Sequence, residues 1–131
     1  MEIYRITITR RKLPENDVNQ ELQWLADSLG FSSLRDKDRS CYRLFVEFVK
    51  NPKKSMSSDE LAFRLNLTRG TVVHHLNRLR ESGIVITERN RYLLREENLK
   101  LLIDDIHKEV EQSLNELKKM AEKIDKEIGL K

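Results

Sequence analysis

Residues 68–83, TRGTVVHHLNRLRESG, gather hydrogen-bond donors, small residues and cations on one side of a predicted helix. Seven residues make up this polar side, namely Gly70, His74 and Asn77, flanked by Arg69, Thr71, Val73 and Arg78. None of the seven is acidic. Asparagine pairs well with adenine, and arginine with guanine or a phosphate. The polar side therefore indicates contact with base edges and the phosphates beside them.

A helix must position these side chains. Thr68 is a good N-cap residue, and Gly83 suits the left-handed position that ends many helices. Between them, Val72, Leu76 and Leu79 recur at spacings of four and three, which predicts one buried stripe. The first turn then holds residues 69–71, where free N–H groups and the helix dipole favour a phosphate.

A second short helix precedes this one. Ser57 and Glu60 have the spacing of a capping box, and Leu61 and Leu65 lie on the apolar side of the helix that would follow. Residues 66–67 leave room only for a tight turn. Two short helices joined in this way predict a helix-turn-helix.

A β-hairpin is predicted directly after the second helix. Residues 84–87 and 91–94 are rich in β-formers, and Arg89–Asn90 reads as the turn. Such a hairpin forms a wing. We expect Arg89, Asn90 and Arg91 at its tip to enter or straddle the minor groove of a nucleic acid.

The run SSDELAFRLNLTRGTVVHHLNRLRESGIV resembles the winged helix-turn-helix of ArsR- and MarR-like prokaryotic transcription regulators. The most similar part is TVVHHLNRLRESGIV, and the resemblance spans residues 39–94. It implies a winged helix fold and binding of double-stranded DNA. Some winged helices instead serve as protein-interaction modules, so function must be argued from the site.

Metal-binding and catalytic motifs are not evident. Some ArsR-type sensors bind zinc on their last helix, and Asp105 and His107 match half of that pattern, but Lys118 and Ala121 occupy the other half. Cys41 is the only cysteine and reads as a buried hydrophobe. We therefore expect no metal, no cofactor and no catalytic residue.

Positive charge is concentrated in the middle of the chain. Residues 35–95 hold 14 Lys and Arg against 7 Asp and Glu, a net charge of +7. Residues 1–34 carry −1 and residues 96–131 carry −3, within a total of +3. A polyanionic partner for the middle segment alone would explain this distribution.

Two helices and a strand are predicted before residue 52. Residues 1–9 alternate apolar and polar like a strand, and Arg10–Lys12 form a basic cluster that reads as a solvated turn or as a phosphate-contacting arm. Asn16 or Asp17 would cap a helix ending at Leu29, with a stripe of Val18, Leu22, Leu25 and Leu29. A second helix is expected from Asp36 to Val49, with an apolar face of Cys41, Leu44, Phe45, Phe48 and Val49.

Residues 96–130 predict one long amphipathic helix, since they hold no proline and no glycine before Gly129. Its apolar stripe is wide, as in a helical bundle rather than a strict coiled coil, and nothing left in the chain could cover it. We therefore expect a homodimer. The expected dimerisation residues are Leu99, Ile103, Ile106, Val110, Leu114, Leu117, Met120 and Ile124.

These features predict a mainly α protein in three parts. They are a strand and amphipathic helix at 1–34, a winged helix-turn-helix at 35–95, and a long dimerisation helix at 96–131. The expected function is sequence-specific binding of double-stranded DNA by a homodimeric transcription regulator. The alternatives are a protein-interaction module and non-specific nucleic-acid binding. No signal peptide or membrane span is evident, so we expect a cytoplasmic protein.

Overall fold

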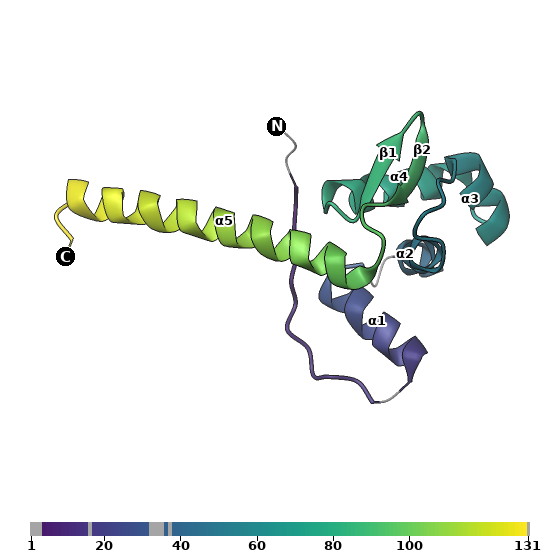
Figure 1. The fold of residues 1–131 in the computed structure, drawn as a ribbon, viewed down its shortest axis with the longest axis horizontal. Helices are drawn as coiled ribbons and strands as arrows, with labels where there is room; N and C mark the ends of the chain where they lie inside the picture. The colour runs from purple at the N-terminus through teal and green to yellow at the C-terminus, as the bar shows by residue number, and fades with distance from the viewer. Residues whose placement is uncertain (1–3, 16, 32–35, 37, 131) are drawn as a thin grey trace.

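The computed structural model describes residues 4–15, 17–31, 36 and 38–130 (Figure 1). Five helices and a two-stranded antiparallel sheet are present in these ranges. In chain order they are α1 (Val18–Ser28), α2 (Ser40–Lys50), α3 (Ser58–Leu65), α4 (Arg69–Glu81), β1 (Val85–Glu88), β2 (Arg91–Leu94) and α5 (Leu99–Glu127). The mainly α winged helix-turn-helix architecture, with a two-strand wing and a long last helix, is confirmed.

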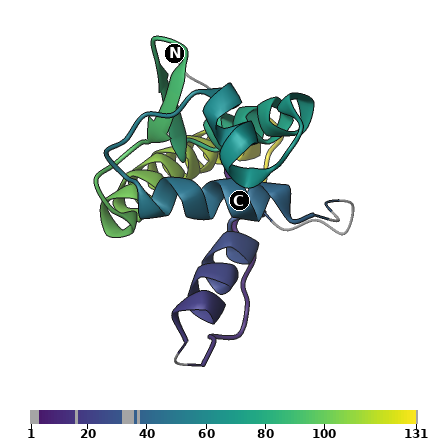
Figure 2. The ribbon, with the colours of Figure 1, turned by 90° about the vertical axis from the view of Figure 1, so that its right-hand side faces the viewer.

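Helix α2 forms the centre of the core. It contacts α1, α3, α4 and β2, and Figure 2 shows it crossing between α1 on one side and α3 and α4 on the other. Leu44, Phe45 and Phe48 are fully buried, as the predicted stripe requires, and so is Cys41. Val49 is half-buried. The recognition element α4 therefore rests on a rigid apolar platform.

The N-terminal end of α2 differs from the prediction. The helix begins at Ser40, four residues after Asp36. The Asp36 carboxylate nevertheless accepts hydrogen bonds from the backbone N–H groups of Ser40 (2.9 Å) and Cys41 (3.0 Å). Asp36 thus satisfies free donors of the first turn from outside the helix.

The strand predicted for residues 1–9 does not form in residues 4–9, and residues 1–3 lie outside the described part of the chain. Instead, the backbone N–H of Arg5 donates to Glu81 O and that of Thr9 to Ser28 O, both at 2.7 Å. These two carbonyls lie in the last turns of α4 and α1, where intrahelical partners run out. The extended segment therefore pairs with helix ends rather than with a strand.

Helix α1 starts after Asp17, whose side chain accepts from the N–H of Asn19, so Asp17 is the cap; Asn16 is not described. Its buried positions are Ala26 and Ser28, and Leu29 follows them into the core. The predicted stripe is only partly used, because Val18 is 67% exposed. The first turn of α1 extends past the edge of the core (Figure 2).

The wing has the predicted turn. Val85 pairs with Leu94 and Glu88 with Arg91, and the turn residues Arg89 and Asn90 have φ values of 51° and 63°. Positive φ at both central residues is the condition for a type I′ turn, which matches the twist of a two-stranded ribbon.

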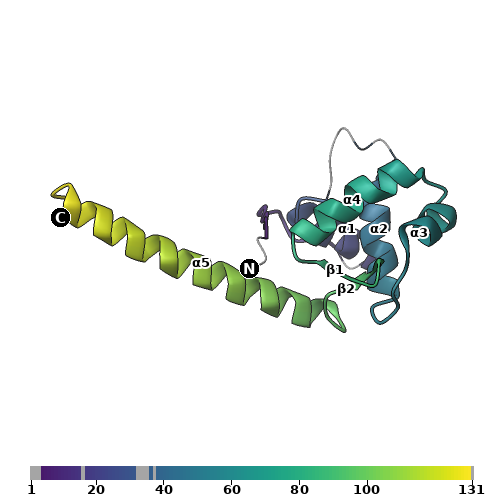
Figure 3. The same ribbon diagram turned by 90° about the horizontal axis from the view of Figure 1, so that it is seen from above.

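Helix α5 projects away from the rest of the molecule (Figures 1 and 3). Leu102 and Ile106 are buried against the winged domain, and Leu99 and Val110 pack beside them. Arg95, just before α5, adds polar contacts: it forms ion pairs with Asp105 (3.6 Å) and Glu109, and its guanidinium lies 5.1 Å from the Tyr4 ring centroid. Within the described residues, no helix combines the length and the apolar character needed to cross a bilayer.

Candidate nucleic-acid interface

Helix α4 is oriented by its buried stripe. Val72, Leu76 and Leu79 are fully buried, and Thr68 Oγ1 accepts from the N–H of Thr71 at 3.2 Å to cap the helix. His75, which neighbours Leu76 in the sequence, is also buried. The opposite side of α4 is consequently left to solvent.

Three of the predicted contact residues, Gly70, His74 and Asn77, are exposed along the middle of that side. Arg69 is exposed in the first turn, 3.5 Å from the carboxylate of Asp59. Thr71 and Val73 are half-buried at the two margins of this exposed side of α4.

The space around Gly70 is open. Apart from its chain neighbours and the backbone of its own helix turn, a Cβ at this position would meet no atom within 4 Å, and the residue lies within helix α4. Packing within the chain therefore does not require glycine here. A surface that meets the α4 backbone from outside would require it.

Arg78 has a partner within the domain. Its Nη2 donates to the carbonyl of Gly30 at 2.9 Å, and the residue is half-buried on the side of α4 that faces the end of α1. The guanidinium joins α4 to α1 and is not presented with His74 and Asn77. The partner lies 48 residues away in the sequence, so helical spacing alone could not reveal it.

Two exposed charges of α4 were absent from the predicted set. Arg80 is exposed and its guanidinium lies 3.4 Å from Asn77 Oδ1. Glu81 follows His74 and Asn77 at helical spacing, so the exposed side does carry an acid at its C-terminal end. Its carboxylate lies 4.0 Å from the guanidinium of Arg5. Spacings of three and four from Asn77 would have identified both residues.

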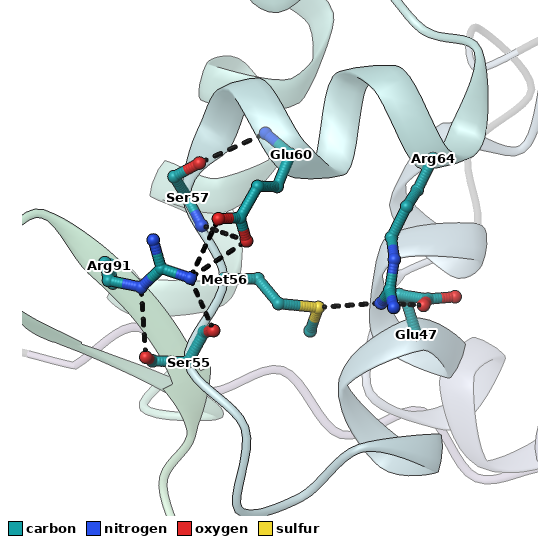
Figure 4. Close-up of polar contacts among 7 residues, drawn as sticks. All are labelled: Glu47, Ser55, Met56, Ser57, Glu60, Arg64 and Arg91. Atoms are coloured by element: carbon teal, nitrogen blue, oxygen red, sulfur yellow. Dashed lines mark hydrogen bonds and ion pairs between the residues drawn. The ribbon is translucent and has the colours of Figure 1, made fainter.

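At the wing, Arg89 and Asn90 form the exposed turn, as expected. Arg91 differs, because its guanidinium folds back from β2 (Figure 4). It donates to Ser55 and forms an ion pair with Glu60 at 2.9 Å. Its partners lie within the domain rather than beyond the tip.

Behind α4 lies a buried polar pair. His75 Nε2 is 3.8 Å from Asp36 Oδ2, and His75 Nδ1 is buried without a partner among the described residues. Burial lowers the pKa of His75, and the Asp36 charge only partly opposes this. Burial tends to raise the pKa of Asp36, but the two backbone hydrogen bonds and His75 hold it below its usual value.

The thiol of Cys41 lies close to this pair. Burial raises its pKa to about 11, so it stays protonated and unreactive. Among the described residues, no three His, Cys, Asp or Glu side chains come together as metal ligands would.

The predicted dimerisation residues fall into two groups. Leu99 and Ile106 pack against their own winged domain, as does Val110 in part, and Ile103 is 37% exposed at the margin. The remaining four are well exposed, namely Leu114, Leu117, Met120 and Ile124. Leu102 was outside the predicted set although it is fully buried, because a heptad pattern does not reveal which turns contact the chain's own core.

Comparison with known proteins agrees with this geometry. No curated protein and no solved structure gave a significant match. One family model matches residues 48–87, which run from the end of α2 to the first strand of the wing, and it describes a bacterial regulatory protein of the arsR family. The matched segment is thus similar to the helix-turn-helix of arsR-family regulators, which supports a role in DNA-binding transcription regulation.

Proposed function

We propose that this protein binds double-stranded DNA sequence-specifically as a homodimer and thereby regulates transcription. The observation that carries the proposal is the division of α4 into two sides. Its apolar stripe is buried on α2, and Gly70, His74 and Asn77 are presented outward beside the exposed Arg69. Such a helix suits the major groove.

The roles of individual residues follow from their positions. Arg69, Gly70 and Thr71 lie in the first turn of α4, where N–H groups favour a phosphate. His74 and Asn77 would meet base edges, and Arg89 and Asn90 would reach the neighbouring minor groove. Arg80 is a further candidate for a phosphate contact, whereas Arg78 and Arg91 are held inside the domain.

The homodimer is proposed from α5. The apolar side chains of its C-terminal half stay exposed in a single chain, and a second copy is the simplest cover for them. One recognition helix reads only a few base pairs, whereas two held at a fixed separation read a palindrome. Residues 1–34, 35–95 and 96–131 would then serve as an N-terminal support, a reading domain and a dimerisation helix.

Fluorescence anisotropy with a random-sequence duplex across a salt series tests DNA binding. We expect salt-steep binding that weakens in an Arg69→Ala/His74→Ala/Asn77→Ala variant, with the salt slope reduced by about 1 for each phosphate that the variant no longer neutralises. A matched control, Lys118→Ala/His107→Ala/Asn115→Ala, removes one cation, one histidine and one asparagine from exposed positions of α5 and should bind like wild type.

Absence of binding at low salt by a folded protein would refute the proposal. An interaction module would then be the better interpretation, with α5 as its docking surface. If binding is strong but a selection from random duplexes enriches no motif, non-specific nucleic-acid binding would replace sequence-specific regulation.

A further inference from the structure

Two nitrogens of the Arg91 guanidinium, Nε and Nη2, have partners within the domain. Nε donates to Ser55 Oγ at 3.1 Å, and Nη2 donates to Ser55 O at 3.0 Å. Nη2 also lies 2.9 Å from both carboxylate oxygens of Glu60. Ser55 belongs to the loop before α3 and Glu60 to α3 itself, so one side chain of the wing reaches two neighbouring segments (Figure 4).

Glu60 also takes part in the N-terminal cap of α3. Ser57 Oγ accepts from the Glu60 N–H at 3.1 Å, and the Ser57 N–H points back to Glu60 Oε2 at 3.4 Å. This reciprocal pair is the capping box of α3. The carboxylate that caps the first helix of the helix-turn-helix is therefore the one that holds the wing.

Backbone contacts support the same junction. Met56 and Tyr92 exchange N–H···O hydrogen bonds at 2.8 Å in both directions, so the loop before α3 runs alongside β2. On the other side of this loop, Arg64 of α3 contacts Glu47 of α2 at 2.7 Å and the sulfur of Met56 at 3.2 Å. The loop is held between the wing and the helices.

We propose that Arg91 is a positioning residue that fixes the wing against α3, and so determines where Arg89 and Asn90 meet the DNA. The wing needs such support because two strands of four residues are marginal on their own. The proposal rests on the DNA-binding function above. It also replaces the prediction that Arg91 touches the DNA.

The substitution Glu60→Gln distinguishes two roles of Arg91, because DNA affinity should fall if Arg91 positions the wing and rise if Arg91 contacts a phosphate. Glutamine still completes a capping box, so α3 keeps its cap, but the ion pair with Arg91 is lost. If Arg91 positions the wing, DNA binding weakens by up to about fivefold, the upper end of the range for an exposed ion pair. If Arg91 contacts phosphate, the variant binds more tightly, because it frees a cation and removes a negative charge.

Asp59→Asn is the matched control. Asp59 precedes Glu60 on α3, carries the same charge and makes no contact with Arg91; its partner is Arg69. This variant should bind DNA as tightly as wild type or more tightly. Equal weakening by both substitutions would refute the proposal, since the effect would then not depend on the contact between Glu60 and Arg91. In an Arg91→Gln background, Glu60→Gln should cause no further loss.

Amide hydrogen exchange in the free protein provides a readout independent of DNA. Loss of the ion pair should speed exchange in residues 85–94 of Glu60→Gln, with α4 unchanged, and Asp59→Asn should exchange like wild type. Unchanged exchange in the wing would overturn the positioning role. If wild type binds no DNA, the proposed function fails, and the exchange experiment still decides whether Arg91 holds the wing.

Discussion

Gly70 is the residue whose chemistry is simplest to isolate. Its surroundings are open and its backbone is helical, so Gly70→Ala should stabilise the fold by roughly 0.5–1 kcal/mol, the usual difference between the two residues in a helix. The same methyl group would obstruct a phosphate at the first turn, and DNA binding should weaken about tenfold, equivalent to about 1.4 kcal/mol. Urea unfolding and anisotropy measure the two effects on one sample. A stabilised variant with unchanged DNA affinity would show that no close approach occurs at Gly70.

His75 and Asp36 give the fold a pH dependence of known sign. Both pKa values are lowered by folding, so the unfolded chain binds more protons and stability falls on acidification. The loss of stability due to His75 begins as the pH falls below about 6.5, and the loss due to Asp36 begins below about 3.8. Urea unfolding at pH 7 and pH 5 should therefore show a loss in wild type that shrinks in His75→Leu. An equal loss in both proteins would assign the pH dependence to other groups.

At the scale of elements, local patterns predicted the helix ends well. Thr68, Ser57 and Asp17 cap three helices because a cap depends on residues two or three positions away. The roles of Arg78 and Arg91 could not be predicted, since their partners lie 48 and 31 residues away. The alternation of apolar and polar residues at 4–9 predicted a strand, but the hydrogen-bond partners of this segment are also distant in the sequence. Its backbone N–H groups donate to carbonyls at the ends of α4 and α1 rather than to a neighbouring strand.

Arg78 was predicted from the sequence to contact DNA, whereas in the structure its guanidinium donates to the carbonyl of Gly30. A substitution of Arg78 tests which of the two roles matters. Arg78→Ala removes the bond that joins α4 to the end of α1, and we expect a loss of about 1–2 kcal/mol in the free energy of unfolding. DNA affinity of the folded variant should change less than in Asn77→Ala. A larger loss of DNA affinity in Arg78→Ala than in Asn77→Ala would instead indicate that Arg78 contacts the DNA.

At the scale of the whole molecule, the proposed homodimer depends on the exposed apolar side of α5. Leu117→Glu/Ile124→Glu places two charges on the exposed apolar side and should yield a monomer by light scattering, with weakened DNA binding. Gln112→Glu/Asn115→Glu adds the same charge to another side of the helix and should remain dimeric. A wild-type monomer at micromolar concentration would exclude this form of assembly.

The contacts of Arg95 with Asp105 and Glu109 lie near the start of α5, so a change there would move the far end of the helix by a larger distance. The helix has 29 residues, about 43 Å at ~1.5 Å per residue, and it is seated on the winged domain by a few side chains near its start. A rotation of about 5° there would move the far end by roughly 3.8 Å, close to the rise of one base pair. Small changes around Arg95, Asp105 and Glu109 would thus become, at the far end of α5, displacements on the scale of the DNA repeat.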